Sequence, residues 1–108
     1  DDWRRNNPRF QGENFTRNLV LADHVVLLAK RKGRTPAQIA LAWLLKQGDD
    51  IVPIPGSKHI ARLEENARAN DVQYEMTAAD LEELDRLFPA GAASGTRYPE
   101  GGMKTLNR

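Results

Sequence analysis

Apolar side chains recur every three or four positions in the first third of the chain, at Phe15, Leu19, Ala22, Val26 and Ala29. This spacing places the five side chains in one stripe along an α-helix. We expect the helix to begin near Glu13 or Asn14 and to end at Gly33, because glycine commonly follows the last helical turn. The pattern therefore predicts a long amphipathic helix.

A second helix is predicted directly after the first. Thr35 is followed by Pro36, which suits the first helical position because that position needs no amide proton. Gln38 stands three residues after Thr35, so the two side chains can close a capping box. Gly48 is expected to stop the helix. Its buried side is predicted to consist of alanine and leucine, namely Ala37, Ala40, Leu41, Leu44 and Leu45.

A short apolar run, Ile51-Val-Pro-Ile54, lies between the turn residues Asp49-Asp50 and Gly56. Such a run is typical of a strand that is covered on both faces. Pro53 conflicts with this interpretation, since proline removes a ladder donor and is usually confined to strand edges or ends. We nevertheless predict one strand here, because turn signals bound the run on both sides.

Two further helices are expected downstream. The third should begin near His59, with an inward face formed by Ile60, Leu63 and Ala67. The fourth should begin at Thr77, with Asp80 as the acidic partner of the cap. Its inner face is predicted to consist of Leu81, Leu84 and Phe88, with Leu87 alongside. From Pro89 onward, repeated glycine and proline predict a loop or tail.

The start of the third helix carries polar side chains that suit a phosphorylated ligand. A helix start exposes unpaired amide groups and the positive end of the helix dipole, and Ser57 and Lys58 stand next to it. Arg62, Glu65 and Asn66 share one side of the helix. A guanidinium suits phosphate, whereas a carboxylate beside an amide suits the amine and ring nitrogen of adenine. Together they suggest an adenine nucleotide.

The same residues also allow an ordinary structural interpretation. Arg62 and Glu65 are three positions apart and could form a surface ion pair of about 0.2–0.5 kcal/mol. Asn66 would then be merely exposed, and Ser57 would only cap the helix. Spacing alone leaves both interpretations open.

Composition excludes several classes of function. Sixteen basic and fifteen acidic residues give a net charge of +1, which provides no general attraction for nucleic acid or an anionic membrane. The apolar runs are far shorter than the roughly 20 residues that cross a bilayer. The chain has no cysteine, so it has neither disulfides nor a thiolate metal site, and we expect no metal. A cytoplasmic location is the default expectation.

The segment Ile54-Pro-Gly-Ser-Lys58 and the helix after it resemble the NADP-binding signature near the C-terminus of the aldo-keto reductases. The resemblance is strongest to the branch with Ile-Pro-Gly-Ser/Thr-Lys. Residues 35–45 are similar to the helix before the last barrel strand, and residues 76–88 to the extra helix after the barrel. Residues 7–14 resemble the loop after the seventh strand.

The resemblance implies an α/β fold, the C-terminal part of a (β/α)8 TIM barrel, mostly helical within this chain and with one barrel strand. Residues 1–88 would form this barrel segment, and residues 89–108 a C-terminal loop or tail. A complete barrel needs about 250 residues, so the rest of it would be a separate N-terminal part. In the family the tail can border the substrate pocket. Arg97, Tyr98 and Met103 could then line this pocket, or the tail could be an unstructured terminus.

The resemblance also implies roles for individual residues. Ser57 would contact the 2′-phosphate of NADP(H), and Arg62 the same phosphate or the adenine face. Many members have lysine where this chain has Gly56, and Lys58 would supply the missing charge. Glu65 and Asn66 would hold adenine. The implied cofactor-binding set is Gly56, Ser57, Lys58, Arg62, Glu65 and Asn66.

The family's tyrosine acid and its supporting residues belong to earlier strands, and their motifs are not in this chain. We therefore expect a part of an NADPH-dependent enzyme that reduces a small aldehyde or ketone, inactive by itself. Two other classes stay open. The chain could be a non-catalytic helical module that binds a nucleotide or a partner protein, or a purely structural fragment.

Overall fold

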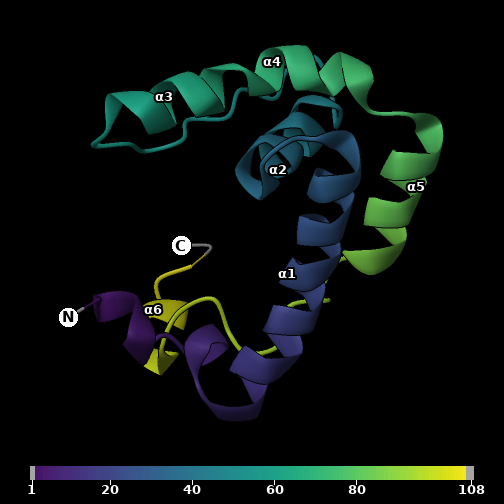
Figure 1. Cartoon of the computed structure of the whole chain (residues 1–108). Coiled ribbons are helices and arrows are strands. Elements are labelled where there is room, and N and C mark those ends of the chain that lie inside the picture. Colours follow the sequence, from purple (N-terminus) through teal and green to yellow (C-terminus); the bar gives the residue numbers. More distant parts are fainter. Residues whose placement is uncertain (1, 107–108) are drawn as a thin grey trace. The chain divides into compact units, whose positions relative to one another are not determined.

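A computed structural model describes residues 2–106, and within this range every regular element is a helix (Figure 1). The elements are η1 (Trp3–Asn6), η2 (Pro8–Phe10), α1 (Gly12–Lys32), α2 (Pro36–Leu45), α3 (Ile60–Ala67), α4 (Ala69–Val72), η3 (Gln73–Glu75), α5 (Ala78–Leu87) and α6 (Glu100–Met103). They form two compact units. Unit 1 contains the residues up to Asp23 and those from Leu87 onward, and unit 2 is His24–Arg86.

The predicted ends of the first helix are confirmed. Helix α1 begins at Gly12, within two residues of the expected start, a difference typical of helix boundaries. It ends at Lys32, and Gly33 follows with a φ of 65°, a conformation that glycine adopts without strain. The amide of Arg34 donates to the carbonyl of Ala29 at 2.9 Å, which closes the last turn.

The capping box of the second helix is also confirmed. The Gln38 amide donates to Oγ1 of Thr35, and the Thr35 amide donates to Oε1 of Gln38, each at 3.2 Å. Pro36 occupies the first helical position, as expected. These residues are local in sequence, so the start of α2 follows from them without help from the rest of the fold.

Unit 2 has a small apolar core at the centre of its helices. Helix α2 contacts α3, α4 and η3, and α4 lies close to α2 in Figure 1. The buried apolar side chains are Leu28, Ala29, Ile39, Ala42, Ala69, Val72, Met76 and Leu84. Removing apolar surface from water stabilises the folded state by about 25 cal/mol per Å². This core therefore contributes to the stability of the unit.

The predicted buried face of α2 is wrong in large part. Ala37, Ala40 and Leu44 are exposed, and the buried positions are Gln38, Ile39 and Ala42. Nearly every residue of this helix is apolar, so its sequence does not single out one face. The contact with α4 selects the buried face instead.

The predicted strand is not formed in the part of the chain that the structure describes. Residues 51–54 are irregular, and Val52 and Ile54 are 79% and 92% exposed. A strand depends on backbone hydrogen bonds to neighbouring strands and on covered faces. Residues 2–106 offer this segment no strand to pair with.

Helix α3 begins at Ile60 after the N-cap His59, so the predicted start near His59 is confirmed. Its predicted inward face is wrong for this chain, because Ile60, Leu63 and Ala67 are all exposed. The buried residues of this region lie further along, at Ala69 and Val72 of α4. An amphipathic pattern shows that a face is suited to burial, but burial itself needs a covering element.

The last predicted helix is confirmed in its cap and in its central core residue. Asp80 accepts hydrogen bonds from the amide and the hydroxyl of Thr77, at 2.8 and 2.7 Å, and Leu84 is buried. Lys32 forms an ion pair with Asp80 at 2.6 Å, and Arg34 pairs with Glu75. These ion pairs join the end of α1 to η3 and α5.

Both carboxylates have lowered pKa values. Burial opposes the ionisation of Asp80, but the bonds from Lys32 and Thr77 together outweigh it and lower the pKa below 3.8. The Arg34 side chain lowers the pKa of Glu75 below 4.5. A carboxylate whose pKa is lower in the folded state than in the unfolded state stabilises the fold. This stability is fully present above the pKa of the unfolded state and is lost as the pH falls through the pKa of the folded state.

We therefore expect the urea midpoint of the chain to fall as the pH is lowered from about 6 to about 3. Asp80→Asn should lower the midpoint at the higher pH and reduce its dependence on acid. The control is Asp49→Asn, because Asp49 is exposed and forms no ion pair within residues 2–106. An acid dependence that Asp80→Asn leaves unchanged would contradict the assignment.

Unit 1 contains the tail that was expected to be a loop. Most of it is irregular, but Glu100–Met103 form the short helix α6. No described helix of either unit is both long and apolar enough to cross a membrane.

Candidate functional site

The segment before α3 places Ser57 in a local turn and leaves the helix start open. The Ser57 hydroxyl donates to the carbonyl of His59 at 2.9 Å and accepts from the His59 amide at 3.2 Å. His59 is the N-cap residue, and its side chain makes no capping hydrogen bond. Ser57 is therefore not the cap of α3, and the first amides of the helix have no side-chain partner among residues 2–106.

Gly56 has no structural reason, within residues 2–106, to be glycine. A Cβ built on it would meet no atom within 4 Å, and its φ is not positive. Neither crowding nor backbone conformation therefore explains this residue. A glycine is also the residue that allows a ligand to approach the backbone most closely.

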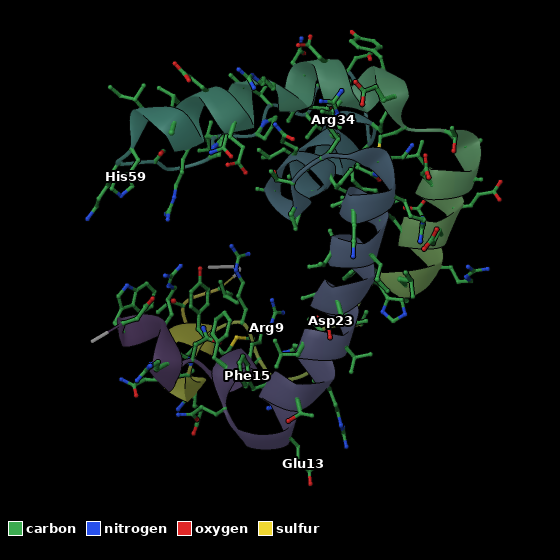
Figure 2. The ribbon with its side chains drawn as sticks, in the orientation of Figure 1. Arg9, Glu13, Phe15, Asp23, Arg34 and His59 are labelled. Atoms are coloured by element: carbon green, nitrogen blue, oxygen red, sulfur yellow. The ribbon has the colours of Figure 1, made fainter. Side chains whose placement is uncertain are left out.

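Arg62 lies on the first turn of α3 and is exposed. It forms no hydrogen bond or ion pair with the described residues, so the surface pair with Glu65 that the structural interpretation allowed does not form. Lys58 is likewise exposed and unpaired within residues 2–106. His59 lies between these two residues in sequence, and Figure 2 shows it at the N-terminal end of α3. The helix start thus carries two cations that have no partner in the described part of the chain.

Glu65 is half-buried and is already bonded to the second helix. Its Oε1 accepts a hydrogen bond from Oγ1 of Thr35 at 2.6 Å. The buried Gln38 donates from Nε2 to the Glu65 carbonyl at 3.0 Å. The capping box of α2 therefore also anchors α3, a role that sequence analysis missed. Residues 30 positions apart give no sequence signal of such a contact.

Two hollows in unit 2 border α3. A polar one of about 340 Å³ includes Glu65 in its lining, and a more apolar one of about 350 Å³ includes Asn66. The polar hollow is lined by Gly33, Arg34, Thr35, Gln38, Ala61, Glu64, Glu65 and Arg68. The apolar hollow is lined by Leu41, Leu45, Val52, Pro53, Pro55, Leu63, Asn66, Ala67, Ala69 and Asn70.

The two residues predicted to hold adenine therefore open onto different hollows. Glu65 and Asn66 are consecutive on α3, so their side chains leave the helix about 100° apart. Arg62 lines neither hollow. The structure does not bring the six predicted residues into one pocket.

The fit to an adenine nucleotide is consequently uneven. The uncapped start of α3, Lys58 and Arg62 suit a phosphate, because they combine unpaired amides with unpaired cations. Glu65 has one carboxylate oxygen occupied by Thr35. Among residues 2–106 no group of three or more His, Asp or Glu side chains is arranged to hold a metal ion.

Comparison with known proteins identifies relatives over almost the whole chain. The aldo/keto reductase family model matches residues 1–88. The chain is 43% identical over 100 residues to the NADP(+) aldo-keto reductase yakc of Schizosaccharomyces pombe. It is 44% identical over 94 residues to probable aldo-keto reductase 1 of Glycine max, and 38% identical over 108 residues to an aldo-keto reductase of Gibberella moniliformis. No solved structure matches the chain.

These alignments cover most of this chain but a minor part of each relative. They include 93%, 87% and 100% of the chain, and 29%, 27% and 32% of the respective relatives. The chain thus spans about a third or less of the length of these relatives. Since the family model covers residues 1–88 of 108, the chain belongs to the aldo-keto reductase family.

Proposed function

We propose that this chain is the C-terminal, NADP(H)-binding part of an aldo-keto reductase that reduces aldehydes or ketones by hydride transfer. The observation that carries the proposal is Arg62, an exposed guanidinium without a partner among residues 2–106, on the first turn of a helix that lacks a side-chain cap. An unpaired cation at a helix start is suited to a phosphate group. The relative from Schizosaccharomyces pombe carries NADP(+) in its name.

In this proposal the start of α3 holds the 2′-phosphate of the cofactor. Arg62 donates paired hydrogen bonds to it, and Lys58 adds charge. Gly56 leaves room for the phosphate beside the backbone, which accounts for a glycine that the described residues do not require. The Ser57 hydroxyl, now bonded to His59, would exchange that contact for the phosphate.

The adenine would contact the remaining two residues across α3, since Glu65 and Asn66 open onto different hollows. Glu65 keeps one carboxylate oxygen beyond its bond to Thr35, and this oxygen can accept from the adenine amine. The Asn66 amide can donate to a ring nitrogen. The Thr35 contact would hold the Glu65 side chain in place before the ligand arrives.

We further propose that the missing N-terminal part of a TIM barrel is the main partner of this chain. The large apolar side chains of Val52, Ile54, Ile60 and Leu63 are all more than half exposed, and exposed apolar side chains of this kind are suited to a surface that another part of the protein covers. Strands of that part would pair with residues 51–54 and convert the irregular run into the barrel strand. The relatives are long enough to supply such a part, since the chain spans only 27–32% of them.

When bound, NADPH supplies the hydride that reduces the carbonyl carbon. The residues of this chain hold the adenosine end of the cofactor and select the form with the extra phosphate. The small carbonyl substrate and the proton donor would meet residues of the N-terminal part. This division explains why the chain alone is predicted to be inactive.

A second candidate is a non-catalytic helical module that binds a nucleotide or a partner protein. It is favoured by the buried core that unit 2 forms without any strand in its described residues. A core of this kind can support cooperative folding of the unit by itself.

The proposal is tested by comparing a full-length reductase that contains this chain with the 108 residues alone. The full-length protein should oxidise NADPH when an aldehyde or ketone is supplied, as measured by the loss of absorbance of the reduced nicotinamide. The chain alone should show no turnover. Turnover by the chain alone, or a full-length protein that fails to bind NADP(H), would contradict the proposal. A full-length protein that binds the nucleotide but oxidises no NADPH with any aldehyde or ketone would favour the module.

A further inference from the structure

The C-terminal tail in unit 1 is attached to α1 through two asparagines. Asn18 donates from Nδ2 to the Ser94 carbonyl at 2.9 Å, and its Oδ1 accepts from the Ser94 amide at 2.8 Å. The Ser94 hydroxyl donates to Oδ1 of Asn14 at 2.8 Å. Asn14 and Asn18 are four positions apart on the helix and so share one face. This face therefore binds every polar group of Ser94.

The residues after Ser94 continue the attachment. Arg9 donates from Nε to the Gly95 carbonyl at 3.3 Å, and Asn7 donates from Nδ2 to the Arg97 carbonyl at 2.7 Å. Gly95 has a φ of 86°, and a Cβ there would stand 2.8 Å from Nδ2 of Asn14 and 3.1 Å from the Pro8 carbonyl. Only glycine adopts this positive φ and also leaves room for Asn14 and Pro8 without strain.

Among residues 2–106, unit 1 contributes no buried apolar side chain to this attachment. All of the buried apolar side chains of the described residues, from Leu28 to Leu84, belong to unit 2. Residues 94–97 are held by five hydrogen bonds to the side chains of Asn7, Arg9, Asn14 and Asn18. A segment with few buried apolar contacts opens more readily than a core element.

We propose that residues 94–97 form a latch that closes the C-terminal tail over the segment Asn7–Asn18 and opens as a unit while α1 stays helical. When the latch is closed, the tail is bonded to Asn7 and Arg9. When it opens, these two side chains are released. It goes beyond the proposed cofactor function, because none of its residues belongs to the cofactor-binding set.

The test is tryptic cleavage after Arg97 together with hydrogen exchange at the Ser94 amide, both in the 108-residue chain. Asn18→Ala removes both bonds to the Ser94 backbone, so cleavage should become about tenfold faster or more, and exchange protection should fall by a similar factor. Asn6→Ala is the matched control, because Asn6 is exposed and its side chain has no bond to the described residues. It should leave both rates unchanged.

Gly95→Ala provides a second, independent variant. The added methyl group meets Asn14 and Pro8, so it should release the tail as Asn18→Ala does. The helical circular dichroism signal should stay the same in both variants. Unchanged cleavage and exchange in both variants would overturn the latch. A loss of helical signal in parallel with tail release would also overturn it, because the tail would then not open independently of α1.

Discussion

Replacing Arg62 by alanine in a full-length reductase that contains this chain is expected to weaken NADPH binding by about 10- to 150-fold and to leave NADH binding nearly unchanged. The factor corresponds to the about 1.5–3 kcal/mol of hydrogen bonds to a charged group. Arg62 is exposed and has no partner within residues 2–106, so its removal breaks no hydrogen bond or ion pair among them. Only the cofactor with the additional phosphate should lose an interaction.

The measurement is the dissociation constant of each cofactor, followed by quenching of tryptophan fluorescence. Arg86→Ala is the control, since Arg86 is an exposed arginine on α5 without an ion pair to the described residues. It should affect neither cofactor. Equal losses for NADPH and NADH in the Arg62 variant would show that this side chain does not read the 2′-phosphate.

Replacing Ile39 by alanine is expected to lower the free energy of unfolding of the chain by about 2–5 kcal/mol. Ile39 is 0% exposed and lies at the centre of the unit 2 core. Its truncation removes apolar contacts and leaves a cavity that close-packed neighbours fill only in part. A small domain has about 5–15 kcal/mol in total, so this one change removes a large share of it.

The same substitution at Ile54 is a matched control, because this isoleucine is 92% exposed. Ile54→Ala should change the free energy of unfolding by less than about 0.5 kcal/mol, as expected of a surface position. Both values come from urea denaturation of the 108-residue chain. Similar losses at the two positions would mean that residues 51–54 are covered in solution, contrary to the structure.

Helix limits could be predicted from sequence because their causes are local. Thr35 with Gln38, and Thr77 with Asp80, satisfy the amides of their own helix starts. Gly33 allows the positive φ that ends α1. No distant residue takes part in these bonds, so the sequence pattern and the structure agree.

Strand formation and the choice of buried face could not be predicted in the same way. Residues 51–54 have the composition of a buried strand, yet they stay irregular within the described part of the chain. Helix α2 is apolar on nearly every side, and its contact with α4 decides that Ile39 is buried while Leu44 is exposed. Both outcomes depend on which elements are available to pack against.

In the candidate site, too, some features follow from the local sequence and others depend on tertiary packing. The residue types around Ser57 and Arg62 predicted a phosphate site, and the structure leaves the cations there unpaired within residues 2–106. The Thr35–Glu65 bond and the separate surroundings of Glu65 and Asn66 had no sequence signal, because they depend on how α2 packs on α3.

By itself the sequence determined the family, the helix ends and the residue types at the start of α3. Motifs and caps depend on neighbours a few positions away, and they persist in a chain that spans only part of its relatives. The tertiary structure alone decided which apolar faces are buried, whether residues 51–54 pair, and how the tail binds Asn14 and Asn18. Burial and pairing need partners that are distant in the chain, and sequence periodicity carries no information about where those partners lie.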